Sequence, residues 1–166
     1  MANGHIVEVG VDHGCSAAYL AERLGPGGQL DLVDIGLEKV GDNLDGYAAI
    51  GLRHRMSSTQ ASAVYENESL DCVFIDADHT YDAVRQDIEV WWPKIKPGGI
   101  LAGHDFTEEH FPGLVKAVLE RFPDPQVLPG NKWRQCDRGC FGVTWHGHIV
   151  GDDEDGIRCP VWWVRK

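Results

Sequence analysis

Basic residues are scarce in this chain, which has 15 Lys and Arg against 26 Asp and Glu and a formal net charge of −11 at pH 7. Unspecific binding to nucleic acids or to anionic membranes depends on clustered Lys and Arg, so the composition disfavours both of these partners. No apolar run approaches the length of a membrane span. The start of the chain, MANGHIVEVG, lacks the basic stretch and the long apolar segment of a secretory signal, and we therefore expect a cytoplasmic protein.

Two nucleotide-binding signatures are also absent. The glycine turn that follows the first predicted strand has the sequence GVDHG, which runs from Gly10 to Gly14. It matches neither the GxGxxG fingerprint of dinucleotide-binding sheets nor the GKS or GKT element of phosphate-binding loops. Nucleoside triphosphate chemistry is therefore disfavoured, and a nicotinamide oxidoreductase ranks third among the functions that the sequence allows.

Cysteines are few and scattered, and their only close pair is Cys136 and Cys140. The spacing of that pair differs from the CxxC arrangement of structural zinc sites, although His146 and His148 are nearby. Ordinary reduced cysteines are the favoured interpretation, and a zinc site is the alternative. Cys15 lies beside a predicted core element and is expected to be a small apolar thiol.

Strand and helix patterns alternate along most of the chain. Strands are predicted at residues 5–10, 30–35, 52–56, 72–75 and 100–103, and helices at residues 17–24, 37–50, 81–91 and 115–122. Ser16 is the predicted N-cap of the first helix, and KPGG, residues 96–99, is a predicted turn. The alternation predicts an α/β fold, doubly wound, with a mostly parallel sheet covered by helices on both faces. The patterns at residues 140–146 and 160–166 predict an antiparallel edge hairpin near the C-terminus.

The glycine turn and the end of the second strand form a first group of candidate ligand-binding residues. Gly10 and Gly14 allow a ligand to approach the backbone closely. Glu8, late in the first strand, suits a positively charged or amine-bearing ligand, and Asp34, at the end of the second strand, can accept both hydroxyls of a ribose. The alternative is a turn that only packs a helix against a strand, with Asp34 as a solvated strand end.

Acids and histidines at the ends of the fourth and fifth strands form a second group, which consists of Asp76, Asp78, His79, His104 and Asp105. Because these strands are neighbours in most sheets of this class, we expect the group to converge at one edge. Paired oxygen ligands suit Mg²⁺ or another hard divalent ion, and a histidine beside them can take a proton from a hydroxyl. The alternatives are that Asp78 or Thr80 caps the following helix and that His79 is a solvated loop residue.

Two segments carry a family resemblance. VEVGVDHGCSAAYLAERL, residues 7–24, resembles the first motif of class I S-adenosylmethionine-dependent methyltransferases. SLDCVFIDADHTYDAVRQDIEVWWPKIKPGGILAGHDF, residues 69–106, resembles a narrower group, the family 24 type of small-molecule methyltransferases. That group is similar to catechol and sugar O-methyltransferases and to the cephalosporin hydroxylase-like proteins. The resemblance implies a seven-stranded sheet of order 3-2-1-4-5-7-6, with the last strand antiparallel.

The resemblance also implies a binding mode for S-adenosylmethionine. The methionine part of the cofactor is expected beside Glu8, Gly10 and Gly14, and its ribose beside Asp34. Ser58, in the segment MSSTQAS, matches the region that lies beside the adenine.

Metal-dependent relatives hold Mg²⁺ with an acid that matches Asp76 and with acidic or amide residues that match His104 and Asp105. The resemblance therefore implies a metal site at Asp76 and Asp105, although His104 stands where those relatives have an acid or an amide. Asp76 is also expected to contribute to the cofactor site and to catalysis. His79 matches a histidine that can serve as the catalytic base.

Relatives usually carry helices before the first strand, which here begins almost at Met1. We therefore expect residues 1–166 to form a single methyltransferase domain without those cap helices. The chain would then be a truncated piece, a minimal enzyme with an open site, or an enzyme completed by a second subunit, such as a second copy of the chain in a homo-oligomer. The function expected is O-methylation of a small hydroxylated acceptor, such as a sugar or a natural product. The alternative is a non-catalytic S-adenosylmethionine-binding domain that acts as a partner or a regulator.

Overall fold

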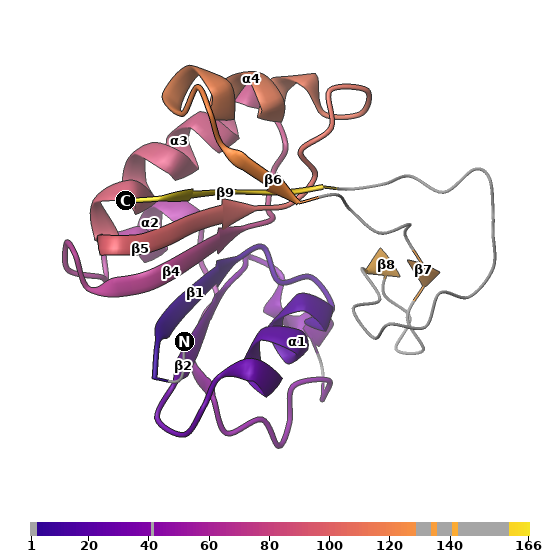
Figure 1. The fold of residues 1–166 in the computed structure, drawn as a ribbon. Coiled ribbons are helices and arrows are strands. Elements are labelled where there is room, and N and C mark those ends of the chain that lie inside the picture. Colours follow the sequence, from indigo (N-terminus) through magenta and orange to yellow (C-terminus); the bar gives the residue numbers. More distant parts are fainter. Residues whose placement is uncertain (1–2, 41, 129–133, 136–140, 143–159) are drawn as a thin grey trace.

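A seven-stranded sheet of order β3-β2-β1-β4-β5-β9-β6 forms the centre of the molecule (Figure 1). The structure, a computed structural model, describes residues 3–40, 42–128, 134–135, 141–142 and 160–166. The strands of the sheet are β1 (His5–Val9), β2 (Gln29–Val33), β3 (Ile50–His54), β4 (Leu70–Ile75), β5 (Ile95–Gly103), β6 (Gln126–Leu128) and β9 (Val161–Arg165). Strands β1 to β5 pair in parallel, and β9 is antiparallel to both β5 and β6. The predicted fold class and strand order are confirmed.

Helices connect the parallel strands. They are α1 (Cys15–Arg23), α2 (Ser58–Ser62), α3 (Tyr81–Trp91) and α4 (Pro112–Arg121), with two 3₁₀-helices, η1 (Leu37–Val40) and η2 (Trp92–Lys94). Two further strands, β7 (Arg134–Gln135) and β8 (Phe141–Gly142), pair with each other outside the main sheet. Within the described ranges, every helix is too short or too polar to span a membrane.

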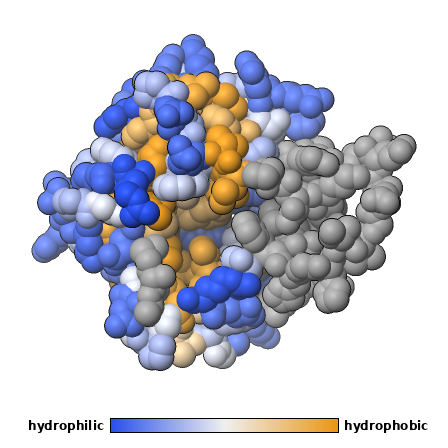
Figure 2. All heavy atoms as spheres, viewed as in Figure 1, coloured by the Kyte–Doolittle hydropathy of each residue, from blue (hydrophilic) through white to orange (hydrophobic). Residues whose placement is uncertain are grey.

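Each face of the sheet has its own hydrophobic core. On one face α1 packs against a core that includes Leu30 and Leu32, and on the other α2, α3 and α4 pack around Trp91 and Trp162. Both tryptophans are fully buried, so they fill the core and are unavailable for stacking on a ligand. Figure 2 shows apolar side chains gathered across the middle of the view, where the strands lie in Figure 1, with hydrophilic residues around them.

The first helix begins one residue before the predicted N-cap. Gly14, not Ser16, caps α1, and the Ser16 hydroxyl donates instead to the Glu8 carboxylate across the sheet edge. The predicted cap was wrong because the helix begins at Cys15, which places Ser16 inside its first turn, and the Ser16 hydroxyl bonds to the buried Glu8 side chain instead. Gly14 adopts a φ of 82°, which favours glycine and turns the chain sharply into the helix.

The helix predicted at residues 37–50 is reduced to the single 3₁₀-turn η1, followed by turns. Gly46 has a φ of 87°, which lies outside the helical region. Glycine is also unfavourable in a helix, which explains why the predicted helix does not continue through this segment. As a result the third strand starts earlier than predicted, at Ile50 instead of Leu52. The prediction of a strand at this place is confirmed, and its boundaries were wrong by two residues.

The predicted KPGG turn lies inside β5. Leu70 pairs with Ile95 and Cys72 with Ile100, so the extra residues of β5 form an irregularity within a continuous strand pair. The antiparallel edge is confirmed, but the outermost strand, β6, lies at Gln126–Leu128, where no strand was predicted. The predicted strand at residues 140–146 lies mostly outside the described residues, and its part Phe141–Gly142 pairs with β7.

The two described cysteines differ from each other. Cys72 is a free thiol, and burial raises its pKa to about 12. Cys15 takes part in a disulfide, so the expected reduced thiol was wrong. Its side chain lies at the start of α1 and is half buried. The alternative zinc site at Cys136 and Cys140 lies outside the described residues.

Candidate functional site

The glycine turn after β1 passes directly against the end of β4. Gly10 has a φ of 87°, and a Cβ placed on it would lie 2.0 Å from the main-chain oxygen of Asp76. The Gly10 amide donates to the Val33 carbonyl at 2.9 Å, which ties the turn to β2 as well. The turn therefore requires glycine at residue 10, because any side chain there would collide with the end of β4. It forms one wall at the carboxyl edge of the sheet, where ligands bind in folds of this class.

Asp34 holds the turn in place. Its carboxylate accepts hydrogen bonds from the amides of Val11 and Asp12, at 2.8 and 3.1 Å, and from the amide of Gly36, at 2.7 Å. Burial alone would raise the pKa of Asp34, but these three donors outweigh it and lower the pKa. Asp34 is thus an ionised acceptor fixed at the end of β2, in the place that the sequence predicted. It is not the freely solvated strand end of the alternative interpretation.

Glu8 is completely buried below the turn. Ser16 donates to Oε1, and Oε2 has no hydrogen-bond partner among the described residues. Burial is the main reason that the pKa of Glu8 rises to about 8, and the nearby carboxylates Asp76 and Asp34 raise it further. The carboxyl group is therefore mostly protonated at neutral pH, a state that the sequence alone did not indicate. A cationic group brought beside Oε2 would favour its ionisation.

This raised pKa makes Glu8 a source of pH-dependent stability. The unfolded chain ionises Glu8 near pH 4.5 and the folded protein near pH 8, so the folded state binds more protons between these values and its free energy of unfolding falls as pH rises. The contribution changes by up to about 1.4 kcal/mol per pH unit. We expect Glu8→Gln to remove this contribution. The free energy of unfolding of the variant, measured by urea denaturation, should therefore rise relative to that of the wild type as the pH goes from about 5 to about 7.5. Parallel curves for the two proteins over this range would contradict the buried, neutral Glu8.

A cleft of about 510 Å³ opens beside the turn. It runs from Gly10 and Asp34, at the ends of β1 and β2, to the start of α2 and the inner side of α3. Ile35, whose side chain is 74% exposed, and Met56 line it between these two ends. The cleft thus offers acidic side chains near both ends and apolar contact between them, a combination that suits a small molecule with polar groups and a flat apolar part.

At the far end of the cleft Ser58 contacts two residues of α3. Its hydroxyl donates to Asp87 Oδ1 and accepts from the Trp91 indole at 2.8 Å. Asp87 is buried and lines the cleft, and the sequence analysis missed it. A signal was available, because Asp87 lies directly beside Ile88 on the apolar stripe of α3, between Val84 and Trp91. An acid inside such a stripe needs a partner or a function.

The acids and histidines of β4 and β5 converge as predicted. His79 Nε2 lies 3.0 Å from Asp105 Oδ2 and 3.5 Å from Asp76 Oδ1, and its ring packs on Phe111 with centroids 4.5 Å apart. His104 Nδ1 lies 3.1 Å from Asp105 Oδ1. One ligand atom from each of Asp76, His79 and Asp105 falls within 4.8 Å of the others. Asp78 does not belong to this cluster: its carboxylate accepts from the amide of Thr80 two residues on, and Thr80, not Asp78, is the N-cap residue of α3.

The two carboxylates set the charge of this cluster. Contacts with Asp105, and then with Asp76, raise the pKa of His79 to about 9. Burial alone would lower the pKa of His104, but Asp105 and Asp76 outweigh it and raise the pKa. At neutral pH the described contacts therefore place an imidazolium at His79 between two carboxylates.

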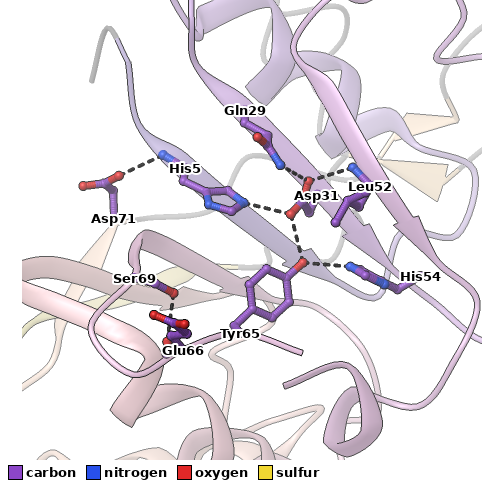
Figure 3. Close-up of polar contacts among 9 residues, drawn as sticks. All are labelled: His5, Gln29, Asp31, Leu52, His54, Tyr65, Glu66, Ser69 and Asp71. Carbon is purple, nitrogen blue, oxygen red and sulfur yellow. Dashed lines mark hydrogen bonds and ion pairs between the residues drawn. The ribbon is translucent and has the colours of Figure 1, made fainter. Parts of the chain in front are cut away.

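A separate polar network lies toward the amino ends of the strands and belongs to the framework (Figure 3). The buried Asp31 accepts from His5 at 2.8 Å, from Gln29 and the Leu52 amide at 2.7 Å each, and from Tyr65 at 3.0 Å. Although burial opposes ionisation, these donors lower the pKa of Asp31 to about 2. The network ties β1, β2 and β3 together and does not line the cleft.

Solved structures share this fold. A SAM-dependent O-methyltransferase from Thermotoga maritima matches 99% of the chain, over 59% of its own length, with a TM-score of 0.64 and 16% identity. An O-methyltransferase from Bacillus cereus in complex with SAH matches 98% of the chain, over 74% of its own length, with a TM-score of 0.65 and 18% identity. An rRNA methylase from Streptococcus thermophilus matches 99%, over 87% of its length, with a TM-score of 0.64 and 13% identity.

At these identities the likeness is one of fold, and no curated protein sequence matches the chain significantly. The family is shown by the match of the sequence to a family model. A model of a methyltransferase domain, the family 24 type, matches residues 7–106, which is more than half of the chain, and the protein therefore belongs to this family of class I S-adenosylmethionine-dependent methyltransferases.

Proposed function

We propose that the protein transfers the methyl group of S-adenosylmethionine to a hydroxyl of a small acceptor. The observation that supports this most directly is the position of Asp76. It lines the cleft that begins at the glycine turn, and its carboxylate also belongs to the cluster with His79 and Asp105. A cofactor in the cleft and an acceptor at the cluster would then meet at this one residue.

The cleft suggests how the cofactor lies. The glycine turn, Gly10 to Gly14, admits the methionine part close to the backbone, and the buried Glu8 below the turn faces its cationic amine. The remaining acceptor capacity of the Asp34 carboxylate serves the ribose hydroxyls. With the ribose at Asp34, the adenine extends away from the turn toward Ser58.

The cluster suggests how the acceptor is handled. Methyl transfer from a sulfonium to an oxygen needs the two reactants held in line and the hydroxyl proton removed. The carboxylates of Asp76 and Asp105 provide proton-accepting groups, the His79 imidazolium lies between them, and one ligand atom of each of the three residues lies within 4.8 Å of the others. We assign His79 and Asp76 to contact the acceptor hydroxyl.

The same carboxylates are a candidate site for a divalent ion such as Mg²⁺. Asp76 and Asp105 supply the oxygen ligands that such an ion prefers, and a bound ion would polarise the acceptor oxygen. The fit is incomplete, because His79 already lies between the two carboxylates and an ion must displace it. His104, in the place of an acid or an amide, contributes a nitrogen that suits Mg²⁺ poorly.

A small acceptor is favoured over RNA by charge. The net charge of −11 opposes binding of a polyanion, whereas two of the matched structures are O-methyltransferases. The rRNA methylase among the matches keeps RNA as the alternative acceptor. A non-catalytic cofactor-binding domain is the alternative from another class, and the assembled cluster of Asp76, His79 and Asp105 speaks against it.

Transfer of labelled methyl from S-adenosylmethionine tests both parts of this proposal. We expect label in small hydroxylated acceptors, for example catechols and sugars, and none in ribosomal RNA. If Asp76 and Asp105 hold an ion, a chelator should abolish the transfer and Mg²⁺ should restore it. Transfer that is indifferent to the chelator would remove the metal and leave both acids with positioning roles. Label in RNA alone would overturn the small-molecule acceptor.

A further inference from the structure

The hydroxyl of Ser58 is held by two side chains of α3. It donates its hydrogen to Asp87 Oδ1 and accepts the indole hydrogen of Trp91 at 2.8 Å. Both partners are rigidly placed, because Trp91 is fully buried in the core and Asp87 is only 6% exposed. The three side chains are therefore joined by hydrogen bonds, and the two partners on α3 fix the orientation of the Ser58 hydroxyl.

A hydroxyl has one hydrogen to donate and two lone pairs to accept with. In Ser58 the hydrogen is used by Asp87 and one lone pair by Trp91, so the group has only one lone pair left. Ser58 lines the cleft, and its side-chain hydroxyl can offer a ligand there only a hydrogen-bond acceptor. Asp87 lines the same end of the cleft and, as a carboxylate, is likewise an acceptor.

We propose that Asp87, acting through Ser58, selects a ligand ring that carries an amino group at this end of the cleft and rejects a ring that carries a carbonyl oxygen there. The inference rests on the proposed function, in which the ring is the adenine of the cofactor. Asp87 is then a positioning residue for Ser58, and its effect is on the identity of the base. The raised pKa of Asp87, about 6, which burial causes and Asp78 increases, still leaves the acid mostly ionised at pH 7.

The selection follows from hydrogen-bond matching. The exocyclic amine of adenine donates, so it satisfies the free lone pair of Ser58. Hypoxanthine has an oxygen at the same position, and two acceptors would then face each other without a hydrogen between them. Leaving such a pair unsatisfied in a closed site is costly, which predicts binding weaker by about 10- to 100-fold for the hypoxanthine compound.

Calorimetric titration with two ligands tests this proposal. These are S-adenosylhomocysteine and S-inosylhomocysteine, which differ only in the base. The wild type should prefer the adenosyl compound by about 10- to 100-fold. In Asp87→Leu the Ser58 hydrogen is released and can turn toward the ligand oxygen, so the inosyl compound should bind more tightly than it does to the wild type and the preference should fall to about threefold or less.

Asp87→Asn is the matched control. Its amide oxygen can still accept from Ser58, so the preference of the wild type should remain. Ser58→Ala removes the oriented acceptor itself and should also lower the preference, and it provides a second test if Asp87→Leu does not fold. A wild-type preference that persists unchanged in both Asp87→Leu and Ser58→Ala would overturn the proposed role of Asp87 and Ser58 in selecting the base. A wild type that binds neither compound would instead overturn the proposed function, and this inference with it.

Discussion

Replacing Gly10 with alanine should cost roughly 3 kcal/mol or more of folding free energy and abolish binding of S-adenosylhomocysteine. Two effects add. A residue with a side chain is strained at a φ of 87°, by about 1–2 kcal/mol. The new Cβ would also lie 2.0 Å from the main-chain oxygen of Asp76 and 2.7 Å from the Cα of Ala77. These are backbone atoms, which cannot rotate away, so the turn and the end of β4 must separate.

Gly46→Ala separates the two effects. Gly46 has the same φ of 87°, but a Cβ placed on it would meet nothing within 4 Å in the described structure. This variant should lose only about 1–2 kcal/mol in urea denaturation and keep its affinity for the cofactor. Equal losses for the two variants would mean that backbone strain alone explains Gly10 and that its close approach to Asp76 is unimportant.

The second large effect is expected at His79. His79→Ala should lower the turnover rate by about 10²-fold or more, the usual contribution of a positioned proton-transfer group. The substitution also removes the cation between Asp76 and Asp105, which lie 3.5 and 3.0 Å from its Nε2. Cofactor affinity should change little, because His79 is not among the residues that line the cleft. Steady-state rates with labelled S-adenosylmethionine, together with calorimetric affinities, measure both quantities.

His110→Ala is the control for this variant, because His110 is an exposed histidine on the neighbouring loop. It should keep the rate of the wild type. Full turnover in His79→Ala would leave His79 as a helix-entry residue and make Asp76 or His104 the next candidates. Loss of cofactor binding together with turnover would show that His79 supports the structure of the cleft instead.

Much of this site was predictable because each residue follows directly from a strand. Asp34 and Asp76 end buried strands, and the carboxyl ends of parallel strands meet at one edge, so a reading of the strands alone places them together. The glycine turn was predictable for the same reason. The family resemblance then supplied the strand order, including the antiparallel strand β9.

Other features depend on tertiary contacts that no local pattern encodes. Glu8 was predicted to suit a positively charged or amine-bearing ligand, but no local pattern indicated that complete burial raises its pKa to about 8. The sequence did not indicate that Asp87, on α3, would accept a hydrogen bond from Ser58, on α2. Residues 37–50 were predicted as a helix, but only Leu37–Val40 form a 3₁₀-turn, and Gly46 has a φ of 87°, which lies outside the helical region.

Calorimetric titration of the intact chain with S-adenosylhomocysteine, and separately with NAD, tests the central claim most directly. If the cleft beside Gly10 and Asp34 is the cofactor site, S-adenosylhomocysteine should bind saturably with one ligand per chain. NAD should not bind, because the turn lacks the glycine spacing that receives a pyrophosphate. Binding of NAD, or no heat with S-adenosylhomocysteine, would contradict the assignment of this cleft.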